Sequence, residues 1–200
     1  MLLLAGCAPD PVPDEDVVVD TAAPLPTAPL TEPLAAAPLL RRMTIDLAGR
    51  LPTPEEVAEV EAAGEISADR IAALMAEPAF EQRLADLLAE QWLTRADHFN
   101  IGHVDYQLDD SLEYGFERAV GDEPLRLMAY VAANDLPWTD IVEADYTIVD
   151  PVLLQVWPLE EATDLPEAYG GVPARYTDDR PAGGVVMTNG LWWRYYSAPN

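Results

Sequence analysis

The sequence predicts a mainly α fold: an irregular helical domain followed by a Pro/Gly-rich, aromatic C-terminal part containing at most short strands. Three observations predict it. Helix start and stop signals recur from Pro38 onward. Apolar residues between these signals repeat at helical spacing. After Trp157, prolines and paired glycines interrupt every apolar run, so a long element is not expected there.

The first four predicted helices are marked by their ends. Pro38 fits the first turn of a helix that ends at Gly49. Residues 53–56, Thr-Pro-Glu-Glu, form a capping box and open a second helix. Ser67 is the cap of a third. Pro78 begins the fourth and longest, whose apolar residues recur at helical spacing: Phe80, Leu84, Leu87, Leu88 and Trp92.

Shorter elements are predicted beyond residue 110. A fifth helix covers 111–119, and Pro124 begins a sixth with Leu127, Met128 and Val131 on one side. Asp150 and Pro151 resemble another cap, placed before residues 152–157.

The C-terminal part and the first helix carry two further expectations. Residues 185–187 and 191–193 are predicted to form at most short strands. Arg41 and Arg42 are predicted to form an ion-pair network with Asp46 that holds the first helix to the rest of the domain.

Charge and cysteine content exclude several classes of protein. The chain has 36 acidic residues and 11 basic ones, and all 11 are arginine, which gives a net charge of -25. A surface this anionic repels phosphates, so no nucleic-acid partner is expected. No run of about 18 apolar residues predicts a membrane-spanning helix. One Cys excludes an internal disulfide, and with two His it makes an all-protein zinc site unexpected.

The composition divides the chain into four segments. Residues 1–7 are the apolar start, and 8–38 hold eight of the 19 prolines and six acids. Proline and like charges prevent helix or sheet from propagating, so 8–38 is predicted to be a disordered tether. Residues 39–157 form the helical domain. Residues 158–200 form an irregular aromatic segment, expected to continue into a C-terminal part beyond this chain.

Leu4-Ala5-Gly6-Cys7 resembles a bacterial lipobox, the end of a lipoprotein signal peptide. The resemblance implies that Cys7 carries a lipid and becomes the first residue of the mature protein. It further implies a chain anchored in the bacterial cell envelope, periplasmic or surface-exposed. The alternative interpretation is a free cysteine in a disordered tail.

Residues 40–57, LRRMTIDLAGRLPTPEEV, resemble the opening of a domain of unknown function in exported proteins of planctomycetes and myxobacteria. Residues 79–99 resemble its long helix, and residues 144–149 and 184–190 resemble segments of a companion domain. The resemblance implies an exported, envelope-associated protein, often longer than this one, and supplies no catalytic residue. Such domains often accompany cytochrome-c-like segments. Cys-x-x-Cys-His is absent here, so no cofactor is expected on this stretch.

Four residues form the strongest candidate for chemistry. Asp97, His98, His103 and Asp105 could bind a divalent metal, or His98 could act as a general base. The spacing matches no established zinc motif. The alternative is that the histidines cap helix carbonyls or pack against an acid. The acid pairs 109–110 and 178–179 are expected on a solvated face.

Four C-terminal aromatic residues suggest a binding surface for a glycan or a partner: Trp192, Trp193, Tyr195 and Tyr196. Strand alternation would place Trp192 and Trp193 on opposite faces, so core or interdomain packing is the favoured alternative.

The sequence thus leads to three functional hypotheses. The first is a non-catalytic envelope lipoprotein module, attached to the membrane through Cys7, that packs against another envelope protein or against its own missing C-terminal domain. The second is the N-terminal part of an exported enzyme or electron-transfer protein whose reactive centre lies beyond residue 200. The third is glycan binding through the terminal aromatic residues.

Overall fold

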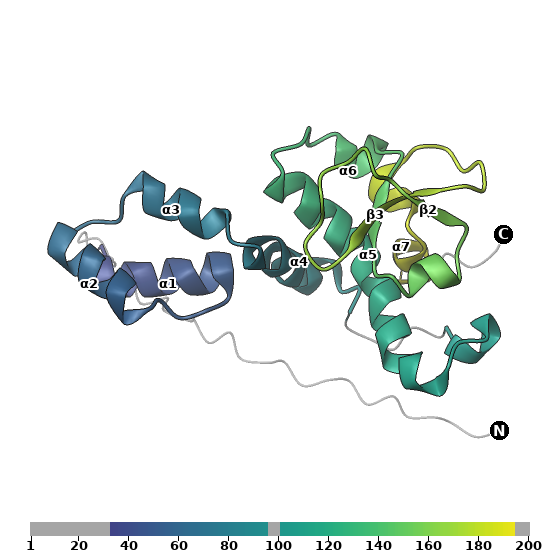
Figure 1. Cartoon of the computed structure of the whole chain (residues 1–200), viewed down its shortest axis with the longest axis horizontal. Coiled ribbons are helices and arrows are strands. Elements are labelled where there is room, and N and C mark those ends of the chain that lie inside the picture. The colour runs from purple at the N-terminus through teal and green to yellow at the C-terminus, as the bar shows by residue number, and fades with distance from the viewer. Residues whose placement is uncertain (1–32, 96–100, 195–200) are drawn as a thin grey trace, which may run out of the picture. The chain divides into compact units, whose positions relative to one another are not determined.

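A computed structural model of the chain describes residues 33–95 and 101–194 (Figure 1). The fold is mainly α, as predicted. The helices are α1 (Ala36–Ala48), α2 (Pro54–Ala63), α3 (Ala68–Met75), α4 (Ala79–Trp92), α5 (Glu113–Ala133), α6 (Asp140–Glu143) and α7 (Asn189–Arg194). The strands are β1 (Thr147–Val149), β2 (Leu159–Glu161) and β3 (Val172–Tyr176). Four short 3-10 helices connect them: η1 (His103–Tyr106), η2 (Asp110–Leu112), η3 (Leu153–Gln155) and η4 (Gly184–Met187).

The predicted ends of the first helices are confirmed. Gly49 ends α1 with a φ of 66°, a left-handed conformation that glycine adopts without strain. The hydroxyl of Thr53 accepts the N–H of Glu56 at 3.3 Å, and the Glu56 carboxylate accepts the N–H of Thr53 at 2.7 Å. This is the complete capping box. Ser67 likewise accepts the N–H of Arg70 at 3.2 Å and begins α3.

A different arginine from the predicted one connects the first helices. Arg42 pairs with Asp46 at 3.5 Å, but both side chains are exposed and belong to α1. This ion pair therefore does not connect α1 to another element. Arg50 contacts Glu56 of α2 at 2.8 Å and Glu77 of the α3–α4 turn at 2.6 Å. Hydrogen bonding to Arg50 lowers the pKa of Glu56 to about 2. Arg50 is therefore the residue that joins α2 to the start of α4.

Helix α5 runs through the proline predicted to start a separate helix. Pro124 lies inside α5, which makes α5 and not α4 the longest helix. Proline lacks the N–H that would bond to the carbonyl of Val120. Gly190 of α7 packs directly on that carbonyl, because a β-carbon at Gly190 would lie 1.9 Å from the oxygen. The proline is thus accommodated by a segment far along the chain.

The core surrounds α5. One cluster of buried residues joins α5 to α4, α6, β1 and η4, and a second joins α5 to η3, β1 and β3. Val185 and Ala174, which come from the segment predicted to be irregular, are buried in these clusters. The described residues from Leu34 to Arg194 therefore form one compact unit.

Three short antiparallel strands lie beside α5, in the order β1-β3-β2. Two predictions nearby differ in part from the structure. Residues 185–187 and 191–193 are helical rather than extended, because Gly184, with a φ of 52°, turns the chain against the backbone of Ile141. The Asp150 carboxylate caps the N–H of Val152 at 3.0 Å as predicted, but only residues 153–155 follow as a 3-10 helix.

Candidate functional site

Four exposed apolar side chains lie on α6, η4 and α7, or in the turn that directly precedes α6. Trp138 is 70% exposed, Val142 of α6 is 53% exposed, Val186 of η4 is 47% exposed and Trp192 of α7 is 56% exposed. Helix α6 contacts η4, and η4 contacts α7. We call these four residues the α6–α7 surface. Apolar side chains grouped on a folded surface are typical of binding sites.

Backbone contacts hold the α6–α7 surface together. The amides of Gly183 and Gly184 both donate to the carbonyl of Ala144, at 3.1 and 3.0 Å. A β-carbon at Gly184 would lie 2.1 Å from the carbonyl oxygen of Ile141, so η4 rests on the α6 backbone. Ile141 itself is buried. The neighbouring Val142 is exposed and lies four residues after Trp138 in the sequence.

The indole of Trp192 is fixed although its ring is exposed. Its Nε1 donates to the carbonyl of Val186 at 2.6 Å, which links α7 to η4. A side chain already held in one orientation loses little conformational entropy when a partner covers it. The α6–α7 surface thus presents a rigid aromatic group.

A buried carboxylate lies beneath η4 and α7. Glu123 of α5 has no solvent exposure, and its Oε1 accepts the hydroxyl of Tyr176 at 2.6 Å and that of Thr147 at 3.1 Å. Its Oε2 is buried and accepts no hydrogen bond of normal geometry from any residue that the structure describes. Burial raises the pKa of Glu123 to about 7, although the two hydroxyls, Arg180 and the amide of Asn189 oppose that rise.

Arg180 connects this carboxylate to the surface. Its guanidinium lies 3.5 Å from the centroid of the Tyr176 ring and pairs with Asp178 at 2.6 Å. Its Nη1 donates to the carbonyl of Met187 in η4 at 2.8 Å. The carboxylate of Glu123 is fully buried, and through Tyr176 and Arg180 this network connects α5 and β3 to η4.

Sequence reasoning missed Glu123 and Trp138. The signal for Glu123 is that three of the four residues one helical turn away from it are apolar: Ala119, Val120 and Leu127. For Trp138 no periodic pattern exists, since it occupies a turn. Its exposure becomes apparent only when Ile141 is placed in the core.

The predicted metal site is described only in part. His103 is buried, and its Nε2 lies 3.1 Å from the Oδ1 of Asp110, whereas Asp105 is exposed. Asp97 and His98 lie outside the described residues, so the metal and general-base hypotheses stay predictions. Within residues 33–95 and 101–194, no three His, Cys, Asp or Glu side chains are grouped to hold a metal ion.

Of the other predicted site residues, some are described by the structure and others are not. Cys7, Tyr195 and Tyr196 lie outside the described residues, and of Trp193 only the helical backbone is described. Trp192 belongs to a helix, so the strand alternation predicted for it was wrong. Glycan binding stays a prediction.

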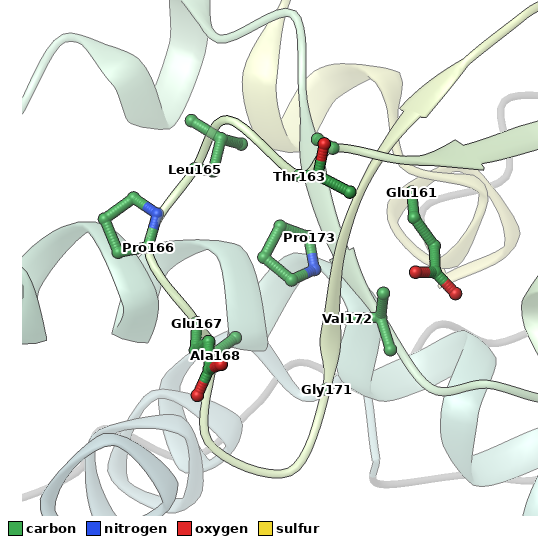
Figure 2. Close-up of a pocket in the computed structure, with 10 residues that line it drawn as sticks. Glu161, Thr163, Leu165, Pro166, Glu167, Ala168, Gly171, Val172 and Pro173 are labelled. Atoms are coloured by element: carbon green, nitrogen blue, oxygen red, sulfur yellow. The ribbon is translucent and has the colours of Figure 1, made fainter.

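A loop beside the sheet encloses a hollow of about 410 Å³ between Glu161 and Pro173 (Figure 2). In Figure 2, the ring of Pro173 faces the inside of the loop, with Thr163 above it and Glu167 below. The loop is anchored at three backbone groups: the Tyr130 hydroxyl bonds to Pro166 at 2.8 Å, Glu81 accepts the amide of Tyr169 at 3.2 Å, and Arg126 bonds to the carbonyl of Gly170. These hydrogen bonds hold the loop, which lines the hollow, in one position.

Among the helices that the structure describes, none combines the length and the apolar character needed to cross a membrane. Comparisons with protein-family models, with curated proteins and with solved structures find no match to this chain.

Proposed function

We propose that this chain is a lipid-anchored module of the bacterial envelope that binds a protein partner through the α6–α7 surface. One observation carries the binding role: Trp138, 70% exposed, directly precedes α6, and Trp192, 56% exposed, lies on α7. Between them η4 contacts both helices, and η4 and α6 each carry an exposed valine. Tryptophan is enriched among the residues that contribute most to protein–protein binding energy.

The charge of the chain indicates the chemistry of the partner. Asp135 and Glu143, both exposed, lie close in sequence to Trp138 and Val142, and the whole chain carries a net charge of -25. Electrostatic complementarity favours a partner whose apolar contact residues are flanked by Lys and Arg. The proposed partner is therefore a basic protein segment with an apolar face.

The anchor is supported by the sequence. The residues before Cys7 resemble a lipobox, and the Pro- and acid-rich tether that follows would separate the folded part from the bilayer. No observation favours the alternative of an electron-transfer protein with its reactive centre beyond residue 200, which stays a prediction.

Site-specific crosslinking in the native bacterium tests the surface. A photo-crosslinking amino acid at Val142 should give a discrete adduct with a protein that has a basic segment. The double variant Trp138→Ser/Trp192→Ser should abolish this adduct. Tyr114, which is 75% exposed at the start of α5, is the matched control position and should give no such adduct. An adduct that survives the double substitution would contradict the proposed surface.

Membrane partitioning tests the anchor. The wild-type chain expressed from its own gene should enter the detergent phase, and its Cys7 should carry a diacylglyceryl group by mass spectrometry. Cys7→Ser should move the chain to the aqueous phase. A wild-type chain with an unmodified thiol would reject the anchor and leave the crosslinking result unaffected.

A further inference from the structure

A second hollow, of about 340 Å³, lies across the anchored loop from the one in Figure 2. The turn between α3 and α4, the end of α5 and the loop line it. Glu167 and Ala168 border both hollows. The second hollow differs from the first because a buried carboxylate lines it.

That carboxylate belongs to Glu81, in the first turn of α4, and only 8% of the residue is exposed. Its Oε2 accepts the amide of Tyr169 at 3.2 Å. Its Oε1 accepts no hydrogen bond from any residue that the structure describes. Burial raises the pKa of Glu81, and the Tyr169 amide and Arg126 oppose this rise. Burial of the side chain disfavours the charged form of the carboxylate, and a cation that donates to Oε1 would stabilise that form.

The neighbouring groups reinforce the negative potential. Helix α5 ends at Ala133, and Ala133 and Asn134 line the hollow, which places the negative end of the helix dipole there. Glu167 is exposed and also lines it. Glu77 contributes little, because Arg50 already neutralises it at 2.6 Å.

The nearest positive charge is directed elsewhere. Arg126 lies 3.8 Å from Asp122 and 3.9 Å from Asp150, and it also bonds to the carbonyl of Gly170. It weakens the negative potential at Glu81 without occupying the hollow, since it is absent from the residues that line it.

The remaining walls are apolar. Phe80 is buried, whereas Met75 and Tyr169 are about half exposed. Such walls suit an alkyl chain, and the face of an aromatic ring attracts an organic cation. We propose that this hollow binds a primary ammonium group on a short alkyl chain, with the nitrogen donating to Oε1 of Glu81. Either a free alkylamine or a lysine side chain of another protein has this chemistry. The proposal does not depend on the α6–α7 surface.

Titration of the full chain with n-butylamine, followed by NMR, tests the proposal. Saturable shifts are expected for the amides of Asn134 and Tyr169. The neutral 1-butanol and the anionic butyrate should bind at least about tenfold more weakly, since they lack the charge-assisted hydrogen bond. Equal binding of butylamine and butanol would overturn the proposal.

Two variants and one control assign the binding to Glu81. Glu81→Gln keeps the shape of the side chain and should weaken butylamine binding about tenfold or more. Glu161→Gln removes a carboxylate charge from the hollow of Figure 2, which Glu161 lines, and not from the second hollow. This variant should therefore leave butylamine binding unchanged. Should Glu81→Gln fail to fold, Ala76→Leu, which narrows the hollow from its exposed rim, should also abolish the shifts. Unchanged binding in Glu81→Gln or in Ala76→Leu would overturn the proposal.

The source of the ammonium group is read from a second titration. Tighter binding of a capped lysine peptide than of butylamine would support a protein side chain as the occupant. Tighter binding of butylamine would support a free amine.

Discussion

At Glu123 a carboxyl group without solvent contact accepts the Tyr176 hydroxyl at 2.6 Å, and its folded-state pKa is about 7 rather than the ordinary 4.5. The folded chain therefore binds this proton more tightly than the unfolded chain does. The stabilisation from the protonated group is fully present below pH 4.5 and is lost as the pH rises through 7.

Glu123→Gln should remove this pH dependence, because the amide does not titrate. Between pH 5 and pH 8.5, the wild-type free energy of unfolding should fall by about 2–3 kcal/mol more than that of the variant. Urea unfolding at both pH values measures it. Glu160→Gln, at an exposed position of β2, is the control and should track wild type. A constant difference between Glu123→Gln and wild type would show that the carboxyl does not titrate in this range.

At the scale of elements, the contact between α5 and α7 depends on Gly190. A β-carbon there would lie 1.9 Å from the Val120 carbonyl oxygen and 3.1 Å from the Pro124 ring. Gly190→Ala must displace α7 and should lower the free energy of unfolding by about 2 kcal/mol or more.

Gly115 supplies the matched control. It lies inside α5 with no atom within 4 Å of a β-carbon, so Gly115→Ala should raise stability by about 0.5–1 kcal/mol. Thermal unfolding followed by circular dichroism measures both variants. Equal effects of the two substitutions would refute the close contact between α5 and α7.

The elements that the sequence predicts well are those whose ends are fixed locally. Helices α2 and α3 begin at Thr53 and Ser67, whose hydroxyls bond to amides three residues later. Helix α5 could not be predicted as one element, because the partner that accommodates Pro124 is Gly190, 66 residues along the chain. The strands have three to five residues, too few for alternation to distinguish them from buried helix segments.

The candidate site was predicted less completely, for a related reason. Trp192 was identified as a surface candidate, but its helical setting depends on the turn that Gly184 makes against α6. Glu81 and Glu123 are two of 36 acids. Their burial follows from contacts with Tyr169 and Tyr176, which lie 88 and 53 residues away in sequence.

For the whole molecule, the excess of 36 acidic over 11 basic residues makes self-repulsion a destabilising force. Raising sodium chloride from about 0.01 to 0.5 M shortens the screening length from about 30 to about 4 Å. The melting temperature should therefore rise by about 2–4 °C, equivalent to about 1 kcal/mol. Scanning calorimetry measures it, and potassium chloride should act identically. A falling melting temperature would mean that ion pairs outweigh the repulsion, such as Arg50 with Glu77 and Arg95 with Asp86, each at 2.6 Å.

The position of η4 and α7 in the core affects how the chain is synthesised. Val185 and Leu191 pack against α5, and Gly190 contacts the carbonyl of Val120. A polypeptide leaves the ribosome N-terminus first, so one flank of α5 has no native cover until about residue 190 has emerged. During that interval the nascent chain exposes an apolar flank of α5, to which a chaperone could bind before the native core closes.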